Sequence, residues 1–320
     1  MPAVFDAPHF HNESAALEYV EAKLWPAGAT CPHCGSDRVN RLAPQKTKPS
    51  NKHPGGKPVI GLWKCYACRK QFTVRIGTVF EDSRAPLHLW LQAIHLLCAS
   101  KKGISTRQLQ RTLGCGMKTA WFMAHRVREM MSDSSGTGPL GSGGAIVEAD
   151  ETFITRSPKT RRTKDAPPRE TRQVLSLVER GGPIRSQFLD HRTVREALWG
   201  QLDKDARLST DSSVVYRKIM PWGQHKFVDH SRRQWRRGDA HTNTLEGFFS
   251  VFKRGLIGVY QHIDEKHIDR YLAEFDFRFN TRAKLGIDDV QRTDRAIAGA
   301  KGKRLTYAKP CIRSLAEPPF

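Results

Sequence analysis

Four cysteines in two closely spaced pairs limit the fold of this chain more than any other feature. Cys31 and Cys34 lie in "CPHCGS", and Cys65 and Cys68 lie in "CYACRKQF". Two such Cys-x-x-Cys turns can present four thiolates to one tetrahedral zinc ion, and the metal then holds together a structure with little apolar core. The loop between the pairs is rich in Lys, Pro and Gly, which a metal-closed structure tolerates. We therefore predict a structural zinc site, with unrelated reduced thiols, or iron in place of zinc, as the alternatives.

The remaining cysteines and the N-terminal segment indicate the environment of the protein. The chain has seven cysteines in 320 residues, and an odd number in a chain of this length argues against a disulfide framework. Cys98, Cys115 and Cys311 stand alone and are interpreted as buried or incidental thiols. No run of about eighteen apolar residues occurs, and the N-terminus lacks the basic-then-apolar order of a signal peptide. We expect a soluble protein without a membrane span, located in the cytoplasm and associated with the nucleoid.

The charge of the chain points to a polyanionic partner. Lys and Arg number 53 against 32 Asp and Glu, which gives a formal net charge of +21 and a sequence pI near 10.0. Nucleic acid is the partner that this excess favours, although a basic protein of another kind, such as a ribosomal factor, has a similar composition. Apolar residues at 38% and aromatic residues at 9% are typical of a folded globule and not of a disordered basic tail.

Residues 83–131 show the pattern of a helix-turn-helix. "LHLWLQAIHLLCASKKG" predicts a helix that stops at a glycine, "ISTRQLQRTLG" predicts a shorter one that ends at Gly114, and "CGMKTAWFMAHRVREMM" predicts another after a Gly-containing turn. We expect the last helix to enter the DNA major groove, with a plain helical linker as the alternative. Its candidate contact residues are Lys118, Thr119, His125, Arg126 and Arg128.

A Gly/Ser-rich stretch, "SDSSGTGPLGSGG" at residues 132–144, predicts a linker before a different kind of domain. Strands are predicted in "AIVEADETFI", "TRQVLSLVER" and "GPIRSQFLD", the last two joined as a hairpin by Gly181 and Gly182. A basic loop, "TRSPKTRRTKDAPPRE", separates the first two strands. A helix in "HRTVREALWGQL" and a fourth strand in "ARLSTDSSVVYRKI" follow, and the fourth strand runs into a further helix. This order predicts a mixed sheet in an α/β domain.

Two aspartates stand where a carboxylate is costly to bury. Asp150 lies inside the first predicted strand, and Asp211 directly follows the fourth. A buried carboxylate needs a charge partner, hydrogen bonds or a metal ion. Each also has a purely structural alternative, because Asp150 can cap a loop and Asp211 can cap the helix that follows it.

The segment "HTNTLEGFFSVFKRG", residues 241–255, predicts a two-faced helix. At about 100° per residue, its polar and apolar side chains separate into neighbouring sectors. The polar sector contains Asn243, Glu246, Ser250 and Lys253, and the apolar sector contains Leu245, Phe248, Phe249 and Phe252. A capping box between Asn243 and Glu246 and ordinary solvation of Lys253 are the structural alternatives. His241 precedes the helix, where it either contacts a phosphate or water, or positions a neighbouring residue.

Three acids on separate elements together fit a two-metal site. Two Mg²⁺ or Mn²⁺ ions about 4 Å apart, each bound by carboxylates and phosphate oxygens, are a recurrent means of breaking and joining phosphodiesters. Asp150 and Asp211 would supply ligands from two strands, and Glu246 would supply one from the later helix. Lys253, two turns after Glu246, would provide a cation for the phosphate. We therefore predict metal-dependent phosphodiester chemistry at these residues.

A second amphipathic helix is predicted in "EKHIDRYLAEFDFRFNTR". Four aromatic residues lie near its apolar side and are interpreted as core: Tyr271, Phe275, Phe277 and Phe279. Arg270, Arg278 and Arg282 are candidate phosphate contacts.

These motifs, in this order, resemble those of a known family. "CPHCGS", "CYACRKQFTVRIGTVFEDSRAPLHLWLQAIHLL", "VEADETF", "STDSSVVY" and "DHSRRQWRRGDAHTNTLEGFFSVFKRGLIGVYQHIDEKHIDRYLAEFDFRFNTR" together resemble the DDE-type insertion-sequence transposases with an N-terminal zinc ribbon, the ISXO-type class. The resemblance extends over roughly residues 15–285. It implies an α/β fold in which a ribonuclease H-like mixed-sheet catalytic domain follows a small zinc ribbon and a helix-turn-helix region.

The resemblance also implies roles and partners. Asp150 corresponds to the first acid and Asp211 to the second. The third position lies on the helix with Lys253, where Glu246 and Asn243 compete because some members of the class use asparagine. The implied activity is cleavage at the terminal inverted repeats of an insertion sequence, followed by transfer of the freed 3′-hydroxyl onto target DNA. Because two DNA ends must be held together, a homo-oligomer is expected.

The domain order expected from these observations has five parts. They are a zinc ribbon with an N-terminal helix at 1–82, a helix-turn-helix DNA-binding region at 83–131, a linker at 132–144, a ribonuclease H-like transposase domain at 145–290 and a basic C-terminal tail at 291–320. The alternative functions are a non-catalytic zinc-ribbon DNA-binding regulator, an inactive domesticated transposase, and a nuclease that cuts without joining.

Overall fold

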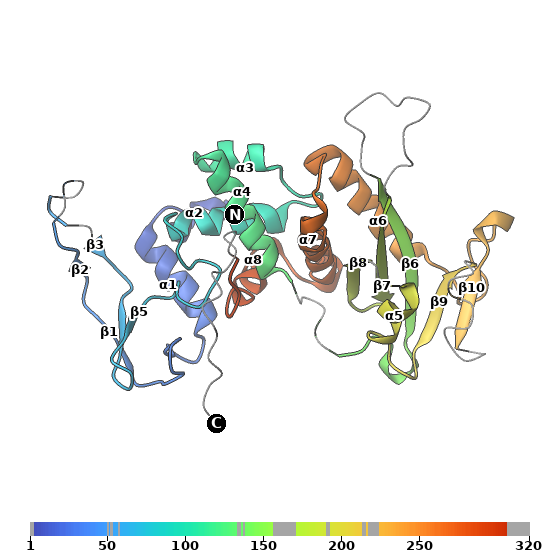
Figure 1. Cartoon of the computed structure of the whole chain (residues 1–320), viewed down its shortest axis with the longest axis horizontal. Helices are drawn as coiled ribbons and strands as arrows, with labels where there is room; N and C mark the ends of the chain where they lie inside the picture. The colour runs from blue at the N-terminus through green and yellow to red at the C-terminus, as the bar shows by residue number, and fades with distance from the viewer. Residues whose placement is uncertain are drawn as a thin grey trace. The chain divides into compact units, whose positions relative to one another are not determined.

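The computed structural model describes residues 3–49, 51, 54–56, 58–132, 136, 138–155, 171–189, 193–212, 216 and 224–305. The chain divides into two compact units, each assembled from separate stretches. Unit 1 contains Met1–His95, Leu113–Met130 and Thr293–Phe320, and unit 2 contains Leu96–Thr112 and Met131–Arg292. Figure 1 follows the chain through both by colour. The domain boundaries expected from the sequence stay predictions.

Unit 1 begins with short helices and strands that carry the cysteine turns. Its first helices are two 3₁₀ turns and an α-helix: Val4–Asp6, Pro8–Phe10 and α1 (Glu13–Leu24). Its strands are β1 (Val39–Arg41), β2 (Gln45–Lys46), β3 (Pro58–Val59), β4 (Trp63–Cys65) and β5 (Gln71–Phe72). β1, β4 and β5 form an antiparallel sheet, and β2 pairs with β3 in the loop between the cysteine pairs. The cluster around the cysteine turns is small among the described residues, with Phe72 packed beside Trp25 and Trp63, as expected of a structure that a metal ion stabilises.

The helices predicted between residues 87 and 130 are present. They are α2 (Leu87–Ala99), α3 (Thr106–Leu113) and α4 (Met117–Met130). α3 ends at Gly114, whose φ of +62° is a left-handed conformation that glycine adopts without steric cost. The arrangement of α3 and α4 as a helix-turn-helix stays a prediction.

The predicted DNA contacts of α4 are wrong for three residues. His125, Arg126 and Arg128 are only 0%, 3% and 1% exposed. Arg126 donates hydrogen bonds to the backbone carbonyls of Val79 and Glu81, at 2.5 and 2.7 Å, so its charge stabilises the interior of unit 1. Lys118 and Thr119, in the first turn of α4, are exposed. The positive charge of a helix therefore did not show which of its faces meets solvent.

Unit 2 is built on a five-stranded mixed sheet. Its strands are β6 (Ile146–Thr155), β7 (Thr171–Glu179), β8 (Ile184–Phe188), β9 (Arg207–Asp211) and β10 (His225–Val228). The order is β10-β9-β6-β7-β8, in which β6, β7 and β8 are antiparallel and β9 and β10 run parallel to β6. The predicted mixed sheet and the β7–β8 hairpin are thus confirmed. β10 was not predicted, since its "HKFV" has two exposed middle residues and no alternating apolar pattern.

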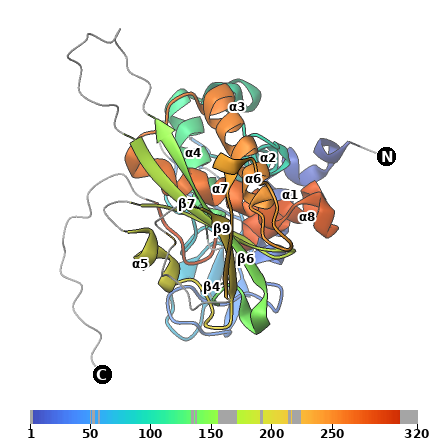
Figure 2. The same cartoon turned by 90° about the vertical axis from the view of Figure 1, so that its right-hand side faces the viewer.

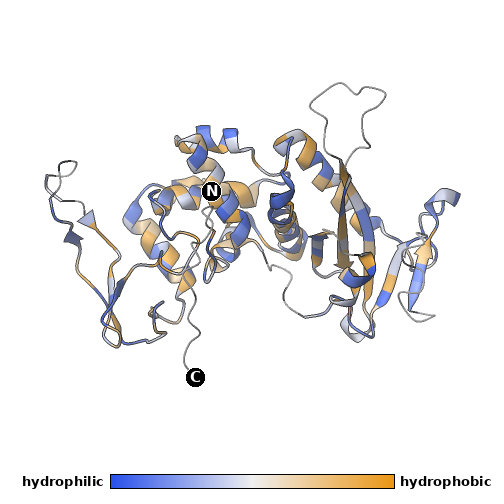
Figure 3. Cartoon of the chain, viewed as in Figure 1, coloured by the Kyte–Doolittle hydropathy of each residue, from blue (hydrophilic) through white to orange (hydrophobic). Residues whose placement is uncertain are grey.

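Helices cover the two faces of this sheet (Figure 2). They are α5 (Val194–Trp199), α6 (Asn243–Gly255) and α7 (Ile268–Asn280). Side chains alternate along a strand, so Leu175 and Leu177 of β7 pack towards α5 while Val174 and Val178 pack towards α6 and α7. Hydrophobic and hydrophilic residues alternate along α6 and α7 in Figure 3, as the two-faced helices require.

α6 and α7 approach each other closely where α6 ends. Gly255 is the last residue of α6, and a Cβ there would lie 2.5 Å from the Phe275 ring and 2.9 Å from the Lys102 carbonyl oxygen. Any larger residue would force the helices apart. A π-turn at Leu256–Tyr260 and a 3₁₀ turn at Glu265–His267 then lead into α7.

Short elements complete the described chain. They are the 3₁₀ turns Ser142–Gly144, His230–Arg232 and Ala283–Leu285 and the helix α8 (Asp289–Ala298). Residues 291–298, at the start of the expected basic tail, are helical, and Ala296 and Ile297 are buried. Cys311, the basic loop at 156–170 and most of the helix expected after Asp211 lie outside the described residues. No helix among the described residues is long and apolar enough to cross a membrane.

Candidate active site and metal centre

The four cysteines of the two turns converge on one point in unit 1. Their sulfur atoms all lie within 4.8 Å of one another. Sγ of Cys31 is 3.7 Å from Sγ of Cys68, and Sγ of Cys34 is 3.6 Å from Sγ of Cys65. A zinc ion with sulfur ligands at about 2.3 Å requires sulfur–sulfur separations of about 3.8 Å in a tetrahedron. The donor set and its spacing therefore fit a structural zinc ion.

The backbone around Cys65 favours the thiolate form that metal binding needs. The N–H of Cys68 points at Sγ of Cys65 over 3.5 Å, and this contact is the main reason that the pKa of Cys65 falls to about 7. At Cys34 the Ser36 backbone acts in the same direction, but burial and hydrogen bonds with the other thiols raise the pKa of Cys34 to about 12. The two turns place these donors by local geometry, with Gly35 at a φ of +74° and Arg69 at +61° after the respective pairs. The zinc site predicted from spacing thus has the expected ligands: Cys31, Cys34, Cys65 and Cys68.

Asp150 lies in unit 2 among other carboxylates. It stands on β6 opposite Ser176 of β7, and its Oδ1 accepts a hydrogen bond from the N–H of Glu151 at 2.8 Å. Burial and then the charge of Asp211 raise the pKa of Asp150 to about 7, with smaller contributions from Glu151 and Glu246. Charges shift a pKa in this way only at short range. The charges of Asp211, at the end of β9, and of Glu246, on α6, therefore lie near Asp150 of β6.

The pairing of β9 with β10 brings one further residue to Glu246. Val228 of β10 is in register with Asp211, so the chain leaves β10 beside that aspartate. His230 lies two residues further on. Its Nε2 is 3.4 Å from Oε1 of Glu246 and 3.3 Å from Oγ1 of Thr242. His230 therefore contacts both Glu246 and the N-cap residue of α6.

The polar sector of α6 faces solvent as predicted. Asn243, Glu246, Ser250 and Lys253 are all exposed, and Leu245, Phe248, Phe249 and Phe252 are all buried. The side chain of Glu246 is 45% exposed, which leaves it accessible to a ligand. Lys253 follows seven residues later, about 10 Å along the helix axis. The capping box between Asn243 and Glu246 does not form, because the N-cap residue is Thr242.

A buried carboxylate fixes the start of α6. Glu148 is fully buried, and its two oxygens accept hydrogen bonds from the N–H and the hydroxyl of Thr244, both at 3.0 Å. Nε of Arg180 also donates to Glu148, at 2.8 Å. Since Glu148 and Asp150 are two positions apart on β6, both side chains lie on the face that meets α6. The contacts therefore fix the helix that carries Glu246 relative to the first acid.

His241 belongs to the same group of contacts at the start of α6. We call this group, which consists of Glu148, Arg180, Ser209 and His241, the clamp. Its carbonyl oxygen accepts hydrogen bonds from Arg180 at 3.0 Å and from the Ser209 hydroxyl at 2.9 Å, and its N–H donates back to Ser209. Nδ1 of its ring lies 3.2 Å from Oε1 of Glu148. Burial and the neighbouring charge of Arg180 lower the pKa of His241. These contacts place the residue behind the start of α6.

Two segments of the chain match known protein families. The model of the ISXO2-like transposase domain matches residues 142–280, and the model of the transposase zinc-ribbon domain matches residues 11–71. Two domain models of one transposase family thus match separate segments of this chain. It is 24% identical over 297 residues, 87% of this chain and 94% of the relative, to a protein of Halobacterium salinarum named "Uncharacterized protein in transposable element ISH50".

The two matched segments of this chain contain both candidate sites. All four cysteines lie within residues 11–71, and Asp150, Asp211 and Glu246 lie within residues 142–280. The two sites differ in how closely their ligands approach. Among the described residues, only the cysteines bring ligand atoms of three or more His, Cys, Asp or Glu residues within 4.8 Å of one another.

The sequence did not predict several residues that lie around the carboxylates of the candidate active site. Glu148 and Arg180 form the buried ion pair behind α6, Ser209 holds His241, and His230 contacts Glu246. One signal was available for Glu148, because an acid in an apolar strand, two positions before another acid, must point to the same face and needs a partner. Arg180 and His230 gave no such signal, since each lies just outside an apolar pattern.

Proposed function

We propose that this chain is a metal-dependent transposase that cuts the ends of its own insertion sequence and joins them to target DNA. The observation that carries the proposal is the raised pKa of Asp150, which results from burial and from the charges of Asp211, Glu151 and Glu246. Clustered carboxylates repel one another unless a cation or protons neutralise them. A site of this kind suits divalent metal ions better than any purely structural role.

The three acids have the donor chemistry that the metal requires. Asp150, Asp211 and Glu246 offer hard oxygen atoms from elements of unit 2, and the exposed Glu246 is accessible from solvent. Two bound Mg²⁺ or Mn²⁺ ions would supply activation of the attacking oxygen and stabilisation of the leaving oxygen. Asn243 is the alternative third ligand, since it is exposed one turn before Glu246.

Other residues of the chain orient the substrate and the ligands. Lys253, exposed on the same sector of α6, is suited to a phosphate of the bound strand. Glu148, Arg180 and His241 position the start of α6, so we assign His241 a positioning role and not contact with the reacting phosphate. His230, whose Nε2 lies 3.4 Å from Oε1 of Glu246, would orient that carboxylate.

The fold supports the same proposal. We propose a ribonuclease H-like fold for unit 2, on the basis of three antiparallel strands followed by two parallel ones in the order β10-β9-β6-β7-β8. β6 and β9 are neighbours in this sheet, which accounts for the proximity of an acid on one to an acid at the end of the other.

DNA binding is proposed from charge and family. The net charge of +21 favours a polyanion. Exposed Lys118 and Thr119 at the start of α4 are the candidates that remain for contacts to the terminal inverted repeats. Holding two ends at once requires a homo-oligomer.

The test is a cleavage and strand-transfer assay on DNA that carries the element's own ends, with Mg²⁺ or Mn²⁺. Asp150→Asn, Asp211→Asn and Glu246→Gln should abolish both products while DNA binding persists. Asn243→Ala tests the competing ligand, and Ser250→Ala, on the same exposed sector, is the matched control. A wild-type protein that binds these ends and never cuts them would refute the enzymatic proposal and favour a regulator. Cleavage without joined products would indicate a nuclease.

A further inference from the structure

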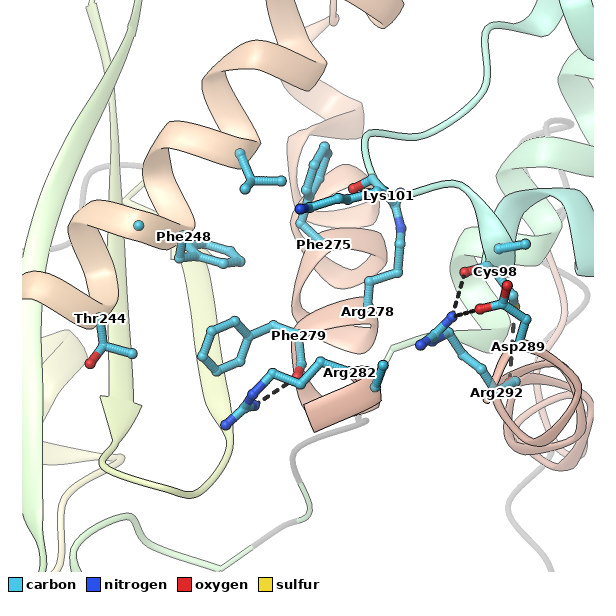
Figure 4. A pocket seen from close by; sticks show the side chains of 14 residues that line it. Cys98, Lys101, Thr244, Phe248, Phe275, Arg278, Phe279, Arg282, Asp289 and Arg292 are labelled. Carbon is cyan, nitrogen blue, oxygen red and sulfur yellow. Dashed lines mark hydrogen bonds and ion pairs between the residues drawn. The ribbon is translucent and has the colours of Figure 1, made fainter. Parts of the chain in front are cut away.

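Unit 2 contains a cavity of about 580 Å³ whose lining includes none of the three acids. It lies between α6 and α7 and extends to the residues around Lys101 and Arg292 (Figure 4). This volume is in the range of pockets that hold small organic ligands. It is large enough for a nucleobase with its sugar.

Aromatic rings line the cavity. Phe248 of α6 and Phe279 of α7 meet edge to face, with ring centroids 5.8 Å apart and an interplanar angle of 89°. In Figure 4 both rings border the open space between the two helices, and Phe275 closes it further along. Such rings offer flat apolar surface on which a base of any identity can stack.

The remaining walls carry positive charge. Among the described lining residues, four are cationic and one, Asp289, is acidic. Arg278 is paired with Glu274 and Arg292 with Asp289, so the charge offered to a ligand is that of Arg282 and Lys101. The guanidinium of Arg282 lies 4.2 Å from the ring centroid of Phe279, and that of Arg278 lies 4.6 Å from that of Phe275. The side chain of Lys101 is exposed beside them. Aromatic rings flanked by cations match a ligand that joins a planar apolar group to a phosphate.

The cavity and the carboxylate site share one helix. Thr244, Gly247, Phe248 and Val251 of α6 line the cavity, while Glu246 lies on the exposed polar sector. Successive residues of a helix are about 100° apart, so the sector of Gly247 borders that of Glu246. A DNA strand held at Glu246 therefore passes close to the mouth of the cavity.

We propose that this cavity receives one unpaired nucleotide of the bound DNA, with its base against Phe248 and Phe279 and its phosphate beside Arg282 and Lys101. This inference rests on the proposed function, because it requires DNA at the carboxylate site. It deepens that function by giving the enzyme a contact that is independent of base pairing. A nucleotide fits better than an apolar peptide, because its phosphate can lie beside the Arg282 guanidinium and the exposed Lys101 ammonium, for which a peptide offers no negative charge.

Gly247 gives a direct way to close the cavity. It is exposed, and a Cβ built there has no atom within 4 Å. Because it lies inside α6 with ordinary helical geometry, substitution adds no backbone strain and improves helix propensity. Gly247→Phe should fill the mouth of the cavity, and Gly247→Ala is the matched control that leaves it open. Neither variant alters a proposed ligand.

The experiment uses the full chain and duplexes that contain the element's end and its flank. 2-Aminopurine, which brightens when a base leaves the stack, is placed at one position at a time, and a second series carries single abasic sites. In the wild type and Gly247→Ala we expect bright 2-aminopurine at one position near the cleavage site. An abasic site at that position should tighten binding, since no base has to be unstacked. Gly247→Phe should lose both effects and bind about tenfold more weakly.

Two outcomes overturn the proposal: a wild-type protein that cleaves the duplex without brightening any position, and a signal that persists in Gly247→Phe. Cleavage of the same duplexes with Mg²⁺ is scored separately. Increased fluorescence without cleavage would contradict the proposed function but would still support the nucleotide pocket.

If Gly247→Phe does not fold, Arg282→Gln is the second variant. It should reduce the slope of binding against salt by about one ion while fluorescence at the same position weakens; an unchanged slope contradicts the phosphate contact.

Discussion

The cysteine site of unit 1 and the carboxylate site proposed for unit 2 would receive a metal ion in two different ways. The four sulfur atoms are already at the separation of a zinc tetrahedron, and their turns set that separation locally. The three acids come from β6, β9 and α6, and burial together with their mutual repulsion raises the pKa of Asp150. A structural site thus needs only local turns, whereas a site open to substrate needs further contacts to hold unfavourable charges together.

Those further contacts form the clamp behind α6. Glu148 and Arg180 tie the start of the helix to β6, and Ser209 ties it to β9. Nothing comparable is needed in unit 1, where the cysteine turns fix their own ligands. The comparison predicts that removing the metal will matter most for folding in unit 1 and most for activity in unit 2.

The largest expected effect is loss of the zinc site. Cys65→Ser removes one thiolate, and since zinc binding supplies about 10 kcal/mol or more to the folding of such small structures, the ribbon should unfold. We expect loss of bound zinc by elemental analysis and rapid proteolysis within residues 11–71. Cys115→Ser, at a lone cysteine, should change neither measurement. A ribbon that stays protected without metal would remove the contrast between the two sites.

The next effect concerns Asp150. Asp150→Asn should lower cleavage at least about a thousandfold, since a metal ligand is lost. The same change should raise the thermal stability of the metal-free protein at pH 7, because Asn carries no charge to repel Asp211 and Glu246. Thermal unfolding without and with Mg²⁺ measures this. A fall in metal-free stability would show that the carboxylates do not repel one another as proposed.

Breaking the clamp should have a smaller effect, which appears both in stability and in cleavage activity. Glu148→Gln leaves Arg180 without its buried partner and should cost about 3 kcal/mol in the free energy of unfolding. The Mg²⁺ concentration for half-maximal cleavage should rise several-fold, because the start of α6 is less firmly held relative to Asp150. A double-mutant cycle with Arg180→Gln measures the coupling. Equal losses in the single and double variants support the clamp, and simple additivity contradicts it.

The smallest expected effect is a pH dependence of the stability of unit 2 that arises away from the proposed metal site. Burial raises the pKa of Asp276, on α7, from 3.8 to about 7, although the Ser186 N–H and hydroxyl donate to it at 2.6 and 2.7 Å. Between about pH 4 and pH 7 the folded carboxyl keeps a proton that the unfolded one loses, so stability should fall as pH rises through this window and level off above it. Asp276→Asn should flatten that part of the profile, measured by urea unfolding at several pH values. An unchanged slope would show that other groups cause it.

Local patterns predicted much of the fold and part of the site. The spacing of Cys31, Cys34, Cys65 and Cys68 predicted the thiolate cluster, because a turn of four residues sets two ligands whatever the rest of the chain does. The 3.6-residue period of α6 predicted which of its side chains face solvent. The mixed sheet followed from the order of strands and helices, but β10 was missed, because an edge strand with exposed side chains has no apolar alternation.

Contacts between residues distant in sequence did not follow from local patterns. Arg126 and Arg128 have the composition of a DNA-reading helix, yet they are buried, and Arg126 satisfies backbone carbonyls of another segment. Residues 291–298 look like the start of a basic tail but form a helix whose apolar residues are buried. Charge and composition do not say which face of a helix packs inwards, since that depends on the partner surface.

The sequence by itself determined the thiolate cluster of unit 1 and the polar sector of α6, because each depends on spacing within a short segment, and the order of its motifs gave the resemblance to a transposase family. The tertiary structure alone decided that Asp211 and Glu246 lie close enough to Asp150 to raise its pKa, that Glu148 and Arg180 hold α6 in place, and that α6 and α7 enclose a cavity lined with aromatic and cationic side chains. Electrostatic interaction and packing act through distances in space, and distant parts of a chain acquire those distances only when it folds.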